Sequence, residues 1–274
     1  MTADPSRKGR VRASVVAAFI ALVAIPIGIA GPVAAAPDST SSPVDKYVAL
    51  GDSVAAGQGG GDYVDACLRS PAGYPALLDA QPKVSLLRNA ACTGATITDV
   101  TADQLGQINR GTTLVTVTVG ANGVDLQRLY AACASGQTPV ECAVALNDAA
   151  TYLNSGQVPA QLGALIASID ARSPRATIVV TGYPVPFAAG LSLVADSVNQ
   201  LVELLNTQLA LTALTAATPD VDVVWAPVDF GGHRVGGELP PAYLGTNPSD
   251  PITFLHPTPD GYVVYRDAVL AAIG

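Results

Sequence analysis

The stretch YVALGDS, residues 47–53, ends on a serine. Its first four residues are mostly apolar and predict a short buried strand, after which Gly51 permits a tight turn. Ser53 would then stand just past the strand, where a sharp turn into a helix lifts its hydroxyl out of the sheet. The same turn directs backbone N–H groups at whatever the hydroxyl attacks. Gly-Asp-Ser is also ordinary turn chemistry, so the rest of the chain decides between a nucleophile and a plain turn.

The composition bounds the kind of protein. The chain has 274 residues, of which 49% are apolar and only 13% charged, so it is long and apolar enough for a sizeable core. Its formal charge of -8 disfavours a nucleic-acid partner, because proteins that bind nucleic acids present a basic surface. We find no internal repeat and no convincing domain boundary.

The N-terminus has the pattern of a targeting segment. Basic residues within 7–12 precede an apolar run over 13–30, and small residues at 33–35 suit cleavage after Ala35. We expect a signal peptide over 1–35, a flexible leader over 36–44 and one domain over 45–274. An uncleaved membrane anchor is the alternative, and Pro26 and Gly28 weaken it. The mature protein is expected to be secreted or in the cell envelope, with no stable membrane span.

The cysteines agree with export. Four are present, and an even number in an oxidising compartment predicts two disulfides with three possible pairings: Cys67, Cys92, Cys133 and Cys142. Metal binding is the second interpretation. No C-x-x-C spacing occurs and the chain has only two histidines, so we predict no metal site.

Strand-like runs alternate with helix-like segments. The predicted strands cover residues 46–50, 84–87, 113–119, 176–181 and 221–226. Several are continuous and β-branched, as in strands covered on both faces. Helical stripes cover 162–169 and 197–217, and a last helix begins with Thr258 as its N-cap and Pro259 in its first turn. This alternation predicts a mostly parallel sheet, with the Gly/Pro-rich segment 227–252 as a surface loop near the site.

Chemistry-bearing residues follow the predicted strands. Ser53 follows the first strand, Gly94 the second and Asn122 the third, while His256 precedes the last helix. In a parallel sheet the ligand crevice lies outside the carboxyl ends of the strands, so Ser53, Gly94 and Asn122 should converge on one edge.

Ser53, Gly94, Asn122 and His256, in this order and context, resemble the SGNH (GDSL-type) hydrolases, above all the secreted actinobacterial lipases and esterases of that family. The resemblance spans residues 46–274. It implies a three-layer α/β/α sandwich with a mostly parallel five-stranded, flavodoxin-like sheet, and an enzyme that needs no cofactor. It also implies a Cys67–Cys92 disulfide flanking the first two blocks.

The resemblance assigns roles that acyl-transfer chemistry requires. Ser53 is a poor nucleophile unless a base lies within hydrogen-bond reach, and His256 can take its proton and return it to the leaving alcohol. The oxyanion of the tetrahedral intermediate would accept hydrogen bonds from the backbone N–H groups of Ser53 and Gly94 and from the Asn122 side chain.

Two positions depart from the family pattern. The family usually has Asp three residues before its histidine, where this chain has Thr253, and Asp after the Asn, where this chain has Gly123. Some other group must therefore hold Nδ1–H of His256 so that Nε2 faces Ser53. We expect the backbone carbonyl of Thr253 to do so, with Asp250 or Asp260 as alternatives.

Each candidate also has a plainer interpretation. Asp52 is more often a turn-stabilising residue than a catalytic acid, Gly94 could be a loop glycine, and Asn122 could be only a helix N-cap. His233, in a glycine-rich loop, competes with His256 for the role of base and ranks second.

The sequence thus predicts a secreted, monomeric serine esterase or lipase acting on a small-molecule or lipid ester through an acyl-Ser53 intermediate. Three alternatives remain: a carbohydrate O-deacetylase, an acyltransferase of the same fold, and an inactive SGNH-like domain that binds an envelope glycan or lipid.

Overall fold

A computed structural model describes residues 43–133 and 139–274 of the chain. The predicted signal peptide and nearly all of the predicted leader therefore lie outside the described residues. The described elements belong to one compact unit. Its first strand is β1 (Asp45–Gly51), whose last five residues are all buried.

Five parallel strands make one sheet in the order β2-β1-β3-β4-β5. Besides β1 they are β2 (Val84–Asn89), β3 (Leu114–Thr118), β4 (Thr177–Thr181) and β5 (Val223–Ala226). All five predicted strands are present, and the order is the predicted flavodoxin-like one. Every residue of β3 is buried, as expected for a β-branched strand covered on both faces.

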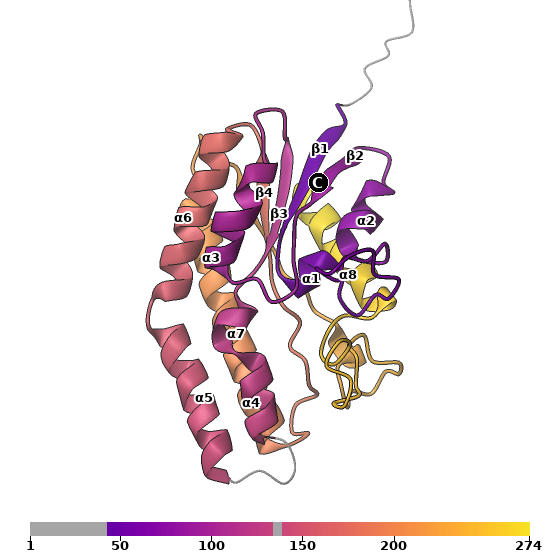
Figure 1. Ribbon diagram of the computed structural model, residues 1–274, viewed down its shortest axis with the longest axis vertical. Helices are drawn as coiled ribbons and strands as arrows, with labels where there is room; N and C mark the ends of the chain where they lie inside the picture. The colour runs from indigo at the N-terminus through magenta and orange to yellow at the C-terminus, as the bar shows by residue number, and fades with distance from the viewer. Residues whose placement is uncertain (1–42, 134–138) are drawn as a thin grey trace, which may run out of the picture. The chain divides into compact units, whose positions relative to one another are not determined.

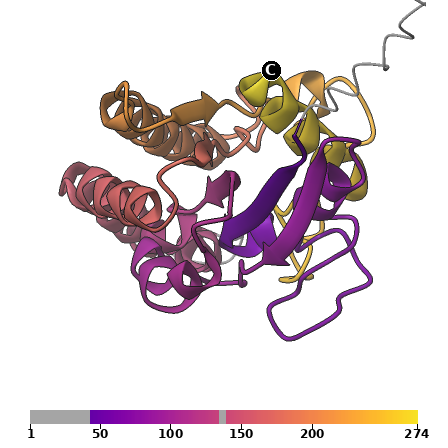
Figure 2. The same cartoon turned by 90° about the horizontal axis from the view of Figure 1, so that it is seen from above.

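Helices cover both faces of the sheet. On one face lie α2 (Tyr74–Asp79) and α8 (Pro259–Ile273). On the other lie α3 (Ile97–Asp99), α6 (Gln157–Arg172) and α7 (Leu193–Ala216), as Figure 1 and Figure 2 show. The predicted three-layer arrangement is therefore confirmed.

Further elements gather at the carboxyl edge of the sheet. The short helix α1 (Ser53–Ala56) follows β1, and the 3-10 helix η3 (Ala121–Val124) follows β3. The helices α4 (Leu126–Cys133) and α5 (Pro139–Asn154) extend beyond this edge in Figure 1. Three further short helices complete the described elements. They are the π-helix η1 (Val100–Gln104) and the 3-10 helices η2 (Leu105–Gln107) and η4 (Gly231–His233).

Local capping explains where the long helices begin. Thr258 caps α8 by accepting a hydrogen bond from the Gly261 N–H, and Pro259 is its first residue, as predicted. The helix α7 begins earlier than its predicted start at 197. It begins at Leu193, because Ser192 is its N-cap: the Ser192 hydroxyl accepts a hydrogen bond from the Ala195 N–H at 3.0 Å.

Two disulfides join the four cysteines. Cys67 pairs with Cys92, as the family resemblance implied, and Cys133 pairs with Cys142. The second disulfide ties the end of α4 to the first turn of α5. Within residues 43–133 and 139–274, no helix is both long enough and apolar enough to cross a membrane.

Candidate active site

Ser53 follows a turn whose backbone conformation requires a glycine at position 51. Gly51 has φ +141°, and a Cβ atom on it would overlap the backbone carbonyl of Thr118 on the neighbouring strand. Asp52 then caps α1 by accepting a hydrogen bond from the Val54 N–H at 3.0 Å. Ser53 is the first residue of this helix, and its side chain stands at the carboxyl end of β1.

His256 meets Ser53 from a segment 203 residues further along the chain. Its Nε2 lies 2.9 Å from Oγ of Ser53, within hydrogen-bond reach. The loop between β5 and α8 carries His256, and Gly245 braces it there: the Gly245 N–H donates to the His256 carbonyl at 2.9 Å. The segment predicted as a loop near the site therefore supports His256 directly.

The prediction that the Thr253 carbonyl orients His256 is wrong by one residue. Nδ1 of His256 lies 3.1 Å from the carbonyl oxygen of Phe254. The Thr253 carbonyl instead accepts the backbone N–H of His256 at 3.0 Å, closing a tight turn. Leu255, the third residue of that turn, has φ +57°, and the carbonyl of the residue before it, Phe254, is the one that faces the ring.

Neither alternative carboxylate reaches the His256 ring, since both ring nitrogens have other partners. Asp250 accepts the hydroxyl of Thr253 at 2.6 Å and the backbone N–H of Ile252 at 3.1 Å. The hydrogen bond from Thr253 lowers the pKa of Asp250. Asp260 is exposed in the first turn of α8, where a negative charge suits the helix dipole.

Burial sets the protonation of His256. Desolvation lowers its pKa to about 4, and the hydrogen bond to the Phe254 carbonyl opposes this shift. The ring is therefore neutral at neutral pH, with one nitrogen able to accept a proton from Ser53.

The structure brings Gly94 and Asn122 together on the same edge. The Asn122 Nδ2 donates to the Ala95 carbonyl at 3.0 Å, which ties η3 to the loop that carries Gly94. Gly94 has φ +78°, and no atom lies within 4 Å of where its Cβ would be. Within the described residues, the backbone N–H groups of Ser53 and Gly94 donate to no other protein group. These groups can therefore bind an incoming oxygen atom.

His233, the second candidate base, has a structural environment. Its ring stacks on Tyr243 with centroids 3.9 Å apart, and its Nδ1 lies 2.9 Å from the Pro241 carbonyl. It makes no contact with Ser53. In the part of the chain that the structure describes, no three His, Cys, Asp or Glu side chains gather where they could hold a metal ion.

A buried pair beneath the nucleophile was not predicted. Asp52 is 1% exposed, and its carboxylate accepts the hydroxyl of Tyr183 at 2.5 Å. Burial raises the pKa of Asp52 to about 7, while the hydrogen bond from Tyr183 opposes that rise. Tyr183 stands two residues past β4, so the rule about strand ends could have found it.

Gln104 was missed as well. It is 4% exposed, and its side-chain amide makes two hydrogen bonds of 2.8 Å, one to the N–H and one to the carbonyl of Gly51. The side chain thus pairs with β1 as a further strand would, two residues before Ser53.

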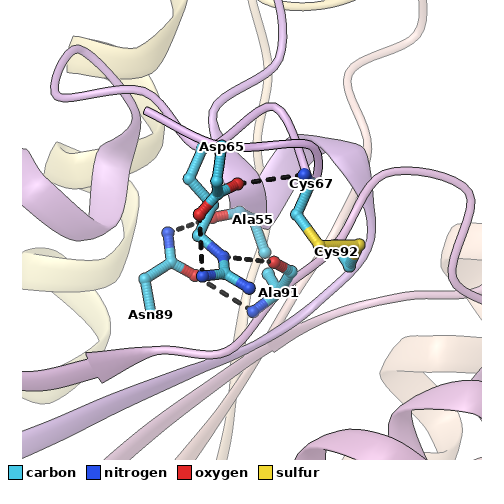
Figure 3. Close-up of polar contacts among 7 residues, drawn as sticks. Ala55, Asp65, Cys67, Asn89, Ala91 and Cys92 are labelled. Atoms are coloured by element: carbon cyan, nitrogen blue, oxygen red, sulfur yellow. Dashed lines mark hydrogen bonds and ion pairs between the residues drawn. A yellow bond between two sulfur atoms is a disulfide. The ribbon is translucent and has the colours of Figure 1, made fainter. Parts of the chain in front are cut away.

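The loop after α1 is fastened to the segment after β2. Figure 3 shows the Cys67–Cys92 disulfide beside a group of polar contacts. Arg69 donates to the Ala91 carbonyl at 2.9 Å and pairs with Asp65 at 3.0 Å. The disulfide and these contacts hold the loop that leads to Gly94 next to the helix that begins with Ser53.

An apolar cavity of about 80 Å³ lies between the segments that carry the candidate site residues and the helices α4 and α7. Val54, Ala121 and Leu255, each next in sequence to a candidate site residue, contribute to its wall. Its other walls come chiefly from one face of α7 and from α4: Val194, Val198, Leu201, Val202, Leu205 and Leu129. The core-facing stripe predicted on the long helix therefore also lines a cavity.

Comparison with known proteins gives consistent results. Residues 49–264 match the GDSL-like Lipase/Acylhydrolase family. A lipase of Streptomyces rimosus is 33% identical over 225 residues, which cover 78% of this chain and 81% of that protein. Lipase 1 of Streptomyces coelicolor is 32% identical over 200 residues, which cover 70% and 73%.

Solved structures show the same fold. The crystal structure of the extracellular lipase from S. rimosus has a TM-score of 0.73 and 31% identity, over 84% of this chain and 100% of that one. Phospholipase A1 from Streptomyces albidoflavus has a TM-score of 0.74 and 27% identity, over 84% and 99%. From its sequence match and its fold, the chain belongs to the GDSL-like lipase/acylhydrolase family and is an ester-hydrolysing enzyme.

Proposed function

We propose that this enzyme hydrolyses carboxylic esters through an acyl-Ser53 intermediate, with His256 as general base. The observation that carries the proposal is the 2.9 Å separation of His256 Nε2 from Ser53 Oγ. His256 accepts the serine proton as Oγ attacks the ester carbonyl carbon, and then gives that proton to the departing alcohol. A water molecule, deprotonated by the same ring, then attacks the acyl carbon; the bond from that carbon to Oγ breaks, and the ring returns the proton to Ser53 as the acid is released.

The oxyanion of each tetrahedral intermediate is stabilised by three donors: the N–H groups of Ser53 and Gly94 and the side-chain amide of Asn122. The Asn122 amide has two hydrogens, and the Ala95 carbonyl accepts one of them. The second is available to the substrate oxygen. The contact with Ala95 also supports this role, because it keeps the amide near the Gly94 loop.

The acyl chain of the substrate occupies the apolar cavity. Its lining favours a long alkyl chain over the acetyl group of a carbohydrate O-deacetylase, since each buried methylene contributes about 0.8 kcal/mol. The names of the relatives agree, as they include lipases and a phospholipase A1. Transfer of the acyl group to an alcohol instead of water would use the same groups.

The mature enzyme is secreted and acts as a monomer. The basic and apolar N-terminal pattern and the two disulfides support export. One chain supplies all four proposed site residues, which supports a monomer. An inactive envelope-binding domain would not need a hydrogen bond between a serine and a histidine, and this contact favours the enzyme.

The test is hydrolysis of p-nitrophenyl esters from acetate to palmitate by residues 36–274. We expect activity that rises towards long acyl chains, is lost in Ser53→Ala and His256→Ala, and is kept in His233→Ala. A preference for acetate would favour the deacetylase. An active Ser53→Ala would contradict the proposed nucleophile.

A further inference from the structure

Gln58 is a buried amide in the loop that follows α1, and it is 5% exposed. A buried amide needs partners at both ends, and this one has them. Its Oε1 accepts the hydroxyl of Thr93 at 2.5 Å, and its Nε2 donates to the Ile252 carbonyl at 2.8 Å.

These partners belong to different parts of the site. Thr93 directly precedes Gly94, and Ile252 lies in the loop that carries His256. The main chain of Gln58 adds two contacts: its N–H donates to the Ser53 carbonyl at 3.0 Å, and its carbonyl accepts the Tyr262 hydroxyl at 2.6 Å. Gln58 thus touches the serine turn and the two loops that carry Gly94 and His256.

The backbone at Gly59, next to Gln58, is tightly packed against the segment that carries His256. Gly59 has φ +95°, and a Cβ atom there would overlap the Pro257 carbonyl and approach the side chain of His256. The loop after α1 therefore packs directly against the residues that carry the base. The Gln58 amide joins this packed pair of loops to the Gly94 segment, in addition to the Cys67–Cys92 disulfide and the hydrogen bond from Arg69 to the Ala91 carbonyl.

We propose that Gln58 is a positioning residue, which sets the placement of Gly94 and His256 around Ser53 through its two side-chain hydrogen bonds. The inference rests on the proposed function, because it assigns Gln58 to the geometry of those roles. No carboxylate holds the His256 ring, so the placement of the ring depends on the loop that carries it.

Loss of this link should affect turnover more than substrate binding. Gln58 does not line the apolar cavity, so acyl binding and KM should change little. A displacement of about 1 Å at the reacting groups can cost on the order of 10²-fold in rate. We therefore expect kcat to fall roughly 10- to 100-fold in Gln58→Ala.

The test compares Gln58→Ala, Gln58→Glu and Thr93→Val with the unaltered enzyme. Thr93→Val removes one of the two side-chain bonds and keeps the shape of the side chain, so it is informative even if Gln58→Ala folds poorly. Ser173→Ala is the control. It removes a buried hydrogen bond, from the Ser173 hydroxyl to the Thr112 carbonyl, at the opposite edge of the sheet.

The pH dependence of Gln58→Glu gives a readout that a purely structural role would not produce. A protonated Glu can accept from Thr93 and donate to the Ile252 carbonyl as the amide does, whereas a carboxylate has no hydrogen to donate. With folding checked by circular dichroism at each pH, its kcat relative to the unaltered enzyme should be near one under acidic conditions. It should then fall as the pH rises. Both proteins share the other ionisable groups around this position, which are Asp52, Asp250, His256, Tyr63 and Tyr262, so the ratio isolates the effect of the substitution.

The expected result is a reduced kcat with unchanged KM in Gln58→Ala and Thr93→Val, and an unaltered kcat in Ser173→Ala. Wild-type kcat in both Gln58 variants, with Ser53→Ala inactive, would overturn the inference and leave the proposed function standing. A kcat ratio for Gln58→Glu that does not change with pH would also overturn it. Activity in Ser53→Ala would overturn the proposed function itself.

Discussion

The Nδ1 atom of His256 lies 3.1 Å from the carbonyl oxygen of Phe254, so a backbone group orients the ring that faces Ser53. A carbonyl can fix the tautomer, because it accepts the Nδ1 hydrogen and leaves the Nε2 lone pair for the serine proton. It stabilises the imidazolium less than a carboxylate would. The proposed mechanism therefore works with a Ser–His pair in place of a triad.

The loss of kcat/KM at low pH should occur at an unusually low pH for an enzyme with a histidine base. Because burial lowers the pKa of His256 to about 4, the neutral ring persists well below the usual histidine range. We expect kcat/KM for a soluble ester to stay level from neutral pH down to about pH 5 and to fall below it. A limb near pH 6.5, the ordinary value, would mean that the ring in solution is more solvated or is paired with a carboxylate.

Thr253→Ala and Asp250→Asn should retain most activity. Both keep the Phe254 carbonyl. Thr253→Ala removes the hydroxyl that donates to Asp250, and Asp250→Asn removes the charge but keeps an oxygen that can accept the Ile252 N–H. The loss should be far smaller than the roughly 10⁴-fold that a wrong histidine tautomer causes. Steady-state kinetics of the two variants test this, and a loss of that size in Asp250→Asn would assign the orienting role to a carboxylate after all.

Asn122→Leu should lower kcat by about 10²- to 10³-fold, the usual effect of removing one oxyanion donor. The variant keeps the approximate size of the side chain and removes its amide. Asn154→Leu, an exposed position at the end of α5, serves as the control and should leave kcat unchanged. Full activity in Asn122→Leu would assign this residue to local structure alone.

Asp52 should make stability depend on pH. Its folded pKa of about 7 lies above the ordinary value of 3.8, so the folded state holds a proton that the unfolded chain releases. The resulting stabilisation is present below pH 4 and is lost as the pH rises towards 7, with a slope of up to about 1.4 kcal/mol per pH unit.

Asp52→Asn removes this titration and provides the measurement. The free energy of unfolding of the wild-type protein, relative to Asp52→Asn, should decrease between pH 4 and 7 and then level off. Tyr183→Phe, which removes the hydrogen bond that favours the carboxylate, should move the upper end of this range to higher pH. A difference that stays constant with pH would show that Asp52 has an ordinary pKa.

The cavity predicts how acyl specificity changes. Val198→Trp would fill the space beside α7, and hydrolysis of the palmitate ester should fall roughly 10²-fold while that of the acetate ester changes little. Leu214→Trp, at an exposed position of the same helix, is the matched control. Equal losses on both esters would indicate that the acyl chain binds elsewhere.

Much of the fold follows from local patterns in the sequence. Continuous β-branched runs identified the five strands, and Thr258 with Pro259 identified the start of α8. The convergence of Ser53, Gly94 and Asn122 followed from the rule that parallel strands present their carboxyl ends on one edge, and the pairing of Ser53 with His256 followed from the family resemblance.

The sequence did not reveal the groups that support the site. Gln58 and Gln104 are polar residues whose partners are backbone atoms or side chains on distant segments, so no local pattern marks them. Tyr183 stands two residues past β4, and only that position could have marked it. The choice between Thr253 and Phe254 depends on one left-handed residue, Leu255, and leucine gives no sign of that conformation.

The most direct measurement is mass spectrometry after treatment with a p-nitrophenyl alkylphosphonate, which reacts with an activated serine. We predict one adduct, on the peptide that contains Ser53, which forms quickly in the unaltered enzyme and at least about 10³-fold more slowly in His256→Ala. Labelling at another residue, or equal rates in the two proteins, would contradict the proposed Ser53–His256 mechanism.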